Sequence, residues 1–183
     1  MTLLVVLLII GWAVFVYNGL VSRRNQVDNA WKQIDVQLKR RHDLIPNLVE
    51  TVKGAMEFER ETLERVIAAR ARAVSAGGRA ESVAAENALS NSLGRLFAVM
   101  ENYPQLKSND NILRLQEELS TTENQLTFSR QHYNDSVTDY NTRTQTFPGN
   151  LIAGFFAFQP AELFKAAEED KSLPKVDLTL RRD

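Results

Sequence analysis

The chain has no cysteine among its 183 residues, and its charges nearly cancel, with 22 basic against 23 acidic side chains. Without cysteine, no lipid-modified cysteine can anchor the chain, although this absence agrees with either side of a membrane. A zinc site would have to be built from the two histidines and carboxylates. The lack of a basic excess argues against a nucleic-acid-binding protein.

Charge is missing altogether from residues 2–22. A helix needs roughly 20 apolar residues to cross a bilayer, and Thr2–Val21 supplies that length. Trp12 and Tyr17 lie toward one end, where amphipathic rings favour the membrane interface. A cleaved secretory signal would need a basic start and a small-x-small cleavage site, which this segment lacks. We therefore expect residues 1–22 to be a retained transmembrane anchor.

The first charges after this segment are basic. Arg23 and Arg24 follow it directly, and residues 23–41 hold six basic side chains against two acidic ones. The positive-inside rule then predicts a single-pass membrane protein with Met1 outside and its C-terminal domain in the cytoplasm. Membrane lipid is accordingly one expected partner. The expected membrane-flanking residues are Trp12, Tyr17, Arg23 and Arg24.

Apolar residues beyond the anchor recur at three- and four-residue steps, which predicts helices that each bury one stripe. The first helix is expected over 23–76, ending before Gly77-Gly78. At about 1.5 Å per residue it would be roughly 80 Å long, too long to pair with its successor as a simple hairpin. Either it breaks near Pro46, with Asp43 capping a restart, or the next two helices form one bent arm at Tyr103-Pro104. Its stripe is Trp31, Ile34, Leu38, Arg41, Ile45, Leu48, Val52, Ala55, Glu59, Leu63 and Val66.

Two further long helices are predicted. One covers 80–101 and breaks at Asn102-Tyr103-Pro104, because a residue before proline avoids the helical region. The other begins with a cap at Asn109 or Asp110 and ends at Phe147-Pro148-Gly149. The inward residues are Leu89, Leu93, Leu96, Phe97 and Met100 in the first, and Ile112, Leu115, Leu119, Leu126, Tyr133, Val137 and Tyr140 in the second.

The end of the chain begins with an apolar run, 151–158, which is too short to span a bilayer. A short helix is predicted over 161–169, and an extended tail over 171–183. Helices with one apolar stripe must cover each other. We therefore predict an all-α protein in which the anchor, 1–22, is followed over 23–170 by an antiparallel four-helix up-and-down bundle of long coiled-coil-like helices.

Side chains capable of chemistry do not form a catalytic pattern. His42 and His132 lack partners at metal-ligand spacing, so both are expected to be solvated. The acidic side chains of 57–64 spread around a helix beside Arg60 and Arg65. No serine lies in a Gly-x-Ser-x-Gly elbow. We expect no enzyme, no catalytic, cofactor-binding or metal-binding residue, and no small-molecule substrate.

Two features are candidates for interaction. Tyr133-Asn134 and Tyr140-Asn141 lie seven residues apart and share one helix face. They could pair within the bundle, through the tyrosine hydroxyls and register-fixing asparagine hydrogen bonds, or bind a partner. Phe155, Phe156 and Phe158 cannot all face one core. They could plug the bundle, lie in the membrane interface or pack against another subunit; we favour the last two, because exposed apolar surface usually marks a contact.

Longer blocks of the chain form distinctive motifs. They include Asp43-Leu44-Ile45-Pro46-Asn47-Leu48-Val49-Glu50, Glu101-Asn102-Tyr103-Pro104-Gln105 and Arg130-Gln131-His132-Tyr133-Asn134. On these motifs the chain resembles the LemA family over nearly its whole length, apart from Ala55, where a tyrosine would be expected. The resemblance implies a protein of the bacterial cytoplasmic (inner) membrane with an N-terminal anchor and an antiparallel four-helix bundle. It implies no catalytic residues, because the family has no established catalytic activity.

The favoured functional hypothesis is a non-enzymatic scaffold that self-associates as a homo-oligomer at the membrane. The apolar run 151–158, the heptad-like stripes and the small residues Gly11 and Ala13 in the anchor motivate it. The alternative is an adaptor or regulator that docks a membrane partner, such as a protease or signalling protein, through the Tyr133/Tyr140 face or the phenylalanines. An enzyme of unknown type is the least favoured hypothesis.

Overall fold

The computed structural model describes residues 1–164, apart from the side chain of Lys107, and every regular element in that part is helical. The predicted all-α class is therefore confirmed there, while the extended tail predicted for 171–183 lies outside the described residues. The elements are α1 (Thr2–Lys53), the 3-10 turn η1 (Glu57–Glu59), α2 (Arg60–Ser75), α3 (Arg79–Met100), α4 (Pro104–Lys107), α5 (Asp110–Gln145) and α6 (Gly149–Phe155).

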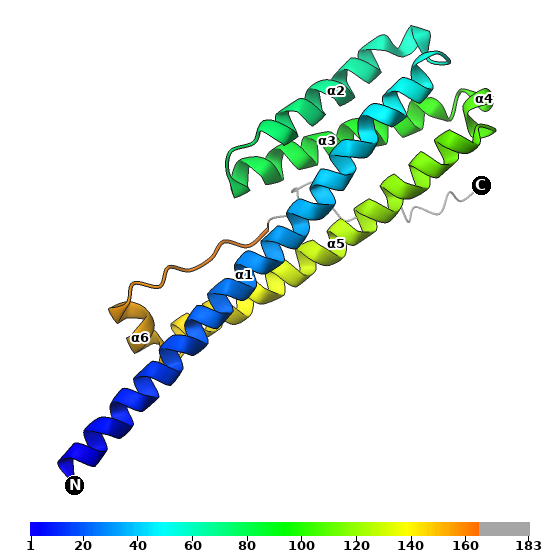
Figure 1. Cartoon of the computed structure of the whole chain (residues 1–183). Coiled ribbons are helices and arrows are strands. Elements are labelled where there is room, and N and C mark those ends of the chain that lie inside the picture. The colour runs from blue at the N-terminus through cyan, green and yellow to red at the C-terminus, as the bar shows by residue number, and fades with distance from the viewer. Residues whose placement is uncertain (165–183) are drawn as a thin grey trace, which may run out of the picture.

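α1 is one continuous helix of 52 residues that starts in the apolar segment and passes through Pro46 (Figure 1). Because proline has no N–H, the carbonyl of His42 loses its helical donor. Arg70 on α2 supplies a replacement: its Nε donates to the His42 carbonyl oxygen at 2.7 Å. The break considered near Pro46, with a restart capped by Asp43, is therefore wrong.

The first helix ends at Lys53 instead of continuing to residue 76. The chain turns at Gly54 and Ala55, Met56 is fully buried, and α2 runs back alongside the end of α1 (Figure 1). The apolar pattern concealed this turn, because Ala55 continues the three- and four-residue spacing while lying only partly buried outside any helix.

α3 and α5 lie where the sequence predicts two helices. α5 is capped by Asn109, whose Oδ1 accepts from the backbone N–H of Asn111 at 3.0 Å and of Ile112 at 3.4 Å. The single turn α4 lies between α3 and α5, and the chain reverses there (Figure 1). The two helices therefore do not form one bent arm at Tyr103-Pro104.

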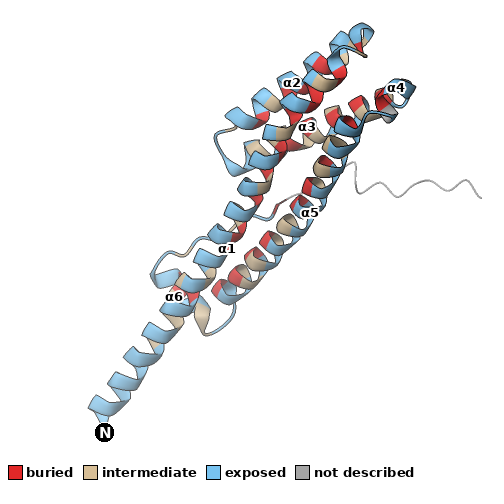
Figure 2. Cartoon of the chain, turned by 45° about the vertical axis from the view of Figure 1, so that its right-hand side comes forward, coloured by how far each residue is buried: buried red, intermediate tan, exposed pale blue. Residues whose placement is uncertain are grey.

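Two hydrophobic clusters follow one another along the molecule. Far from the anchor, α1, α2, α3 and α5 contribute to one core. Nearer the anchor, α1 packs against α5, and residues 158–164, here called the strap, add Phe164 to that core. Buried residues line the facing sides of α1 and α5, whereas the apolar start of α1 is exposed (Figure 2). Residues 161–164 are not helical, so the helix predicted over 161–169 is wrong for them; the others lie outside the described residues.

Candidate functional site at the membrane-proximal end

The apolar start of α1 projects beyond the rest of the described molecule (Figure 1). α1 is long and apolar enough to cross a membrane, and no other helix among residues 1–164 meets that criterion. Trp12 is 38% exposed and lies on this projecting part. Tyr17 is the first aromatic side chain of α1 with a ring contact to another element. The projecting part of α1 therefore ends near Tyr17, where Phe156 and Phe158 contact the helix.

That contact brings the phenylalanine run to the anchor. The Tyr17 ring centroid lies 4.7 Å from that of Phe156 and 5.7 Å from that of Phe158. Phe158 is half-buried, and the Arg24 guanidinium lies 5.4 Å from its ring centroid. Phe155 and Phe156 remain 82% and 52% exposed. Only one of the three phenylalanines therefore packs well into the molecule, and the other two form apolar surface beside the anchor.

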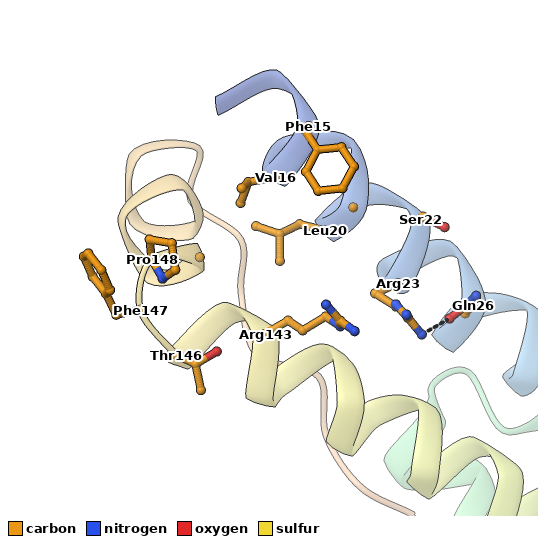
Figure 3. A pocket seen from close by; sticks show the side chains of 12 residues that line it. Phe15, Val16, Leu20, Ser22, Arg23, Gln26, Arg143, Thr146, Phe147 and Pro148 are labelled. Carbon is orange, nitrogen blue, oxygen red and sulfur yellow. Dashed lines mark hydrogen bonds between the residues drawn. The ribbon is translucent and has the colours of Figure 1, made fainter. Parts of the chain in front are cut away.

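A close approach between the start of α6 and the end of α5 places the phenylalanine run beside the anchor. A Cβ added to Gly149 would overlap the backbone carbonyl of Arg143, so only glycine fits at the start of α6. The turn holds Phe147 and Pro148 opposite Leu20 of α1 across a cavity of about 490 Å³ (Figure 3). This part of the site could not be read from the sequence, because nothing in the pattern places 147–149 beside α1.

Charged side chains line the end of the cavity that points away from the anchor. Arg23 contacts Asp139 through Nη1 at 2.8 Å, and the same nitrogen donates to Gln26 Oε1 at 3.2 Å. Arg143 donates from Nε to Asp139 Oδ1 at 3.2 Å. Two guanidinium groups therefore share one carboxylate where α1 and α5 meet. Both arginines line the cavity that has the apolar wall (Figure 3).

Tyr133 and Tyr140, predicted as candidate interaction residues, are only 2% exposed. Their hydroxyl groups donate to backbone carbonyls of the strap: Tyr133 to Glu162 at 2.8 Å, and Tyr140 to Gln159 at 2.8 Å. Burial raises the pKa of both hydroxyls, only partly opposed by Arg79 at Tyr133 and by Arg24 at Tyr140. Both tyrosines therefore stay protonated donors at neutral pH.

The neighbouring asparagines hold the strap by its backbone. Asn141 accepts from the N–H of Ala161 and donates to its carbonyl, both at 2.9 Å. Asn134 accepts from the N–H of Phe164 at 2.8 Å and donates to its carbonyl at 3.2 Å. Seven helical residues advance about 10.5 Å, and three extended residues advance about 10 Å, so each heptad of α5 matches three residues of strap. The Tyr-Asn pairs thus fix the strap's register.

A buried charged cluster lies deeper in the molecule. Arg41 of α1 is 1% exposed and pairs through Nη2 with Glu86 of α3, itself 1% exposed. Its Nη1 donates to Ser90 at 2.9 Å and to Glu123 of α5 at 2.6 Å. His42 Nε2 lies 2.6 Å from the second Glu86 oxygen. The sequence placed Arg41 in the buried stripe, but a pattern within one helix cannot reveal partners on two others.

The pKa of Glu86 reflects this cluster. Burial raises it, but the hydrogen bond with His42 and the charge and hydrogen bond of Arg41 outweigh burial and hold it below its ordinary value. His42 is only 12% exposed, so the expectation that it is solvated is wrong, whereas His132 is exposed as predicted. Among residues 1–164, no three potential metal ligands come together. The cluster serves to align α1, α3 and α5.

Comparison with known proteins identifies the family. The model of the LemA family matches residues 30–178. This chain belongs to the LemA family. Protein LemA of Metamycoplasma hominis is 26% identical over 170 residues, which cover 90% of this chain and 78% of the relative. Membership of the LemA family, together with the apolar N-terminal helix, indicates that this chain is a membrane-associated protein.

Magnetosome proteins are also similar to this LemA-family chain. MamQ 2 of Paramagnetospirillum magneticum is 25% identical, and MamQ of Magnetospirillum gryphiswaldense is 23% identical, each over 175 residues. The matches cover 81% of this chain but only 64% of each of these relatives. LemA-family proteins are not known as enzymes.

Proposed function

We propose that this LemA-family chain is a non-enzymatic, self-associating scaffold at the bacterial cytoplasmic membrane, with its C-terminal domain in the cytoplasm. The observation that carries the proposal is the continuity of α1, which extends without a break from the apolar anchor into both cores. Because no loop separates the apolar start of α1 from the domain, the helix itself sets the orientation of the domain to the bilayer. α1, α2, α3 and α5 then serve as an antiparallel four-helix bundle.

The depth of α6 supports contact with lipid. Thr2 to Tyr17 covers about 22 Å of helix, whereas the hydrocarbon layer is about 30 Å thick. If the span begins near Thr2, the ring contacts of Tyr17 with Phe156 lie below the membrane surface. α6 carries no charged residue, and Phe155 and Leu151 are 82% and 59% exposed. α6 therefore lies in the interfacial layer as a second, shallow attachment to the membrane.

Self-association is supported by surface that one copy leaves uncovered. A Cβ added to Gly11 would meet nothing within 4 Å, and small residues allow close helix approach within a bilayer. Phe155 and Phe156 add exposed apolar surface beside Tyr17 of α1. A neighbouring copy could cover either surface.

The test is the mass of the full-length protein in nanodiscs at micromolar concentration. An oligomer is expected, and F155S combined with F156S should shift it toward monomer. The matched control is F128S, because Phe128 is 70% exposed on α5, away from the anchor. A monomeric wild type would overturn the scaffold, and an equal loss in F128S would remove the phenylalanines from the interface.

The second candidate is an adaptor that captures a specific membrane protein through Phe155 and Phe156, which are exposed enough to receive one. The Tyr133/Tyr140 face supports this candidate poorly, because the strap covers both rings. Crosslinking from the position of Phe155 in membranes, followed by mass spectrometry, separates the two candidates. The adaptor requires one dominant non-self partner, whereas the scaffold requires self-crosslinks.

A further inference from the structure

The cavity between α1 and the start of α6 joins an apolar wall to a cationic end. Phe15, Val16 and Leu20 line it from α1, and Phe147 and Pro148 line it from the opposite side (Figure 3). Arg23 and Arg143 contribute to the same cavity. We propose that it binds one phospholipid with a net negative headgroup, with the phosphate between the two arginines and an acyl chain along Phe15 and Phe147. This inference rests on the membrane placement in the proposed function.

The position of each wall fits that ligand. Phe15 and Phe147 are each 78% exposed, as side chains that meet an acyl chain would be. Arg23 follows Leu20 by three residues, or about 4.5 Å of helix, which separates the last apolar side chain of α1 in the cavity lining from the first cation. This is the order in which a lipid presents its acyl chain, glycerol and phosphate. No residue between Thr2 and Ser22 is charged, so the cationic end lies at the headgroup side.

The electrostatics favour an anion over a neutral group. Arg23 and Arg143 bring two positive charges to the single carboxylate of Asp139, which leaves a net positive charge. Arg23 uses Nη1 for its contacts with Asp139 and Gln26, and Arg143 uses Nε. Each guanidinium thus keeps further N–H groups that can turn toward the cavity, and the planar fork of arginine suits phosphate oxygens.

A purely structural ion pair explains less of this arrangement. It accounts for Asp139 joining α1 to α5, but such a pair needs neither an adjoining cavity of about 490 Å³ nor an apolar wall. A soluble anion would account for the arginines but not for Phe15 and Phe147. The combination of charge, apolar lining and depth therefore points to a lipid.

The experiment is native mass spectrometry of the full-length protein released from detergent, with phosphatidylglycerol or phosphatidylcholine added at equal concentrations. We expect wild type to retain phosphatidylglycerol in preference. R143Q and R23Q should each reduce that preference about fivefold, the effect of one basic residue near an anionic surface. The control is R65Q, because Arg65 forms a comparable i,i+4 pair with Glu61 far from the anchor.

A variant in the apolar wall and a competition with a soluble phosphate complete the experiment. F147S, at a residue exposed enough to tolerate serine, should weaken retention of both lipids, and millimolar sn-glycerol 3-phosphate should not displace phosphatidylglycerol. Equal retention of the two lipids, an equal effect of R65Q, or displacement by the soluble phosphate would each overturn the proposal. The same spectra report subunit number: a monomer that prefers phosphatidylglycerol overturns self-association alone, and an oligomer without that preference overturns the lipid site alone.

Discussion

Single residues in this protein act mainly as connectors between helices. Arg41 and Glu86 join three helices through one buried cluster, and Arg70 satisfies a carbonyl on a different helix. Breaking such contacts leaves a charge or carbonyl buried without its partner, which costs more than the net value of the bond. Substitutions at these connectors should therefore destabilise the fold more than their number of contacts suggests.

The Glu86 carboxyl predicts a pH dependence of stability. Its folded pKa lies below its ordinary value of 4.5, so its ionised form stabilises the fold above that value. This stabilisation is lost as the pH falls through the folded pKa, because the folded state must then take up a proton. E86Q should lower the free energy of unfolding at pH 7 by roughly 3–5 kcal/mol and flatten its decline in acid. Urea unfolding from pH 7 to well below pH 4.5 measures this, with E61Q as an exposed control.

The proline in α1 predicts coupling between two helices. R70M should destabilise the wild type by about 1–3 kcal/mol, because it removes the donor to the His42 carbonyl. In a P46A background the cost should be smaller, since the alanine introduced there would provide the missing helical N–H. A double-mutant cycle by urea unfolding measures the difference, and R72M on exposed Arg72 is the control. A coupling energy near zero would contradict the assigned role of Arg70.

At the scale of elements, the strap takes the place of a packed helix in the membrane-proximal core. The far core takes side chains from α1 through α5, but the membrane-proximal core is formed mainly by α1, α5 and the strap. Asparagine side chains of α5 hold the strap by hydrogen bonds to its backbone. The pairing considered for the Tyr-Asn motifs therefore takes place within the chain, but with a non-helical segment rather than another helix. Leu38 of α1 and Leu126 of α5 lie in this core beside the tyrosines.

The strap predicts site-specific hydrogen exchange. N141A should speed exchange of the Ala161 amide, whose N–H loses the Asn141 oxygen, while the Phe164 amide stays protected by Asn134. N134A should produce the reverse pattern. The double variant should lose about 2–4 kcal/mol of stability, from four side-chain hydrogen bonds. Asn124 is exposed, and N124A is the control. If each single variant lost protection at both amides equally, the two asparagines would not hold the strap independently.

On the scale of the whole molecule, the described residues form a long helical body that continues from the apolar helix start. If this apolar start crosses a membrane, as proposed, the reversal at Gly77-Gly78 lies on the same side as Arg23 and Arg24, because α1 is continuous. The positive-inside rule predicts that this side is the cytoplasm. The orientation of the anchor therefore determines on which side of the membrane the domain lies.

Topology can be tested at Gly78, where the open turn accepts a side chain because a Cβ would meet nothing within 4 Å. The chain has no cysteine, so G78C introduces a unique thiol. In intact spheroplasts, an impermeant thiol reagent should leave this thiol unlabelled, and detergent permeabilisation should expose it. Labelling without detergent would reverse the orientation and leave the basic flank without its assigned role.

Local patterns were sufficient for several features of this protein. The uncharged segment before Arg23 determined the anchor candidate, and apolar spacing determined α3, α5 and their buried faces. Side-chain chemistry narrowed the cap of α5 to Asn109 or Asp110, and the structure shows Asn109 in that role. Each of these depends on residues close in sequence, whose spacing is fixed by the 3.6-residue period of a helix.

Only the tertiary structure decided the rest. α1 passes Pro46 because Arg70 reaches across from α2, and it ends at Lys53 because Met56 is buried in the far core. The strap, the partners of Arg41 and the cavity beside the anchor join residues separated by roughly 20 to 130 positions in the chain, and no helical period relates them. A sequence pattern predicts which face of a helix is buried, whereas tertiary packing determines which residues cover that face.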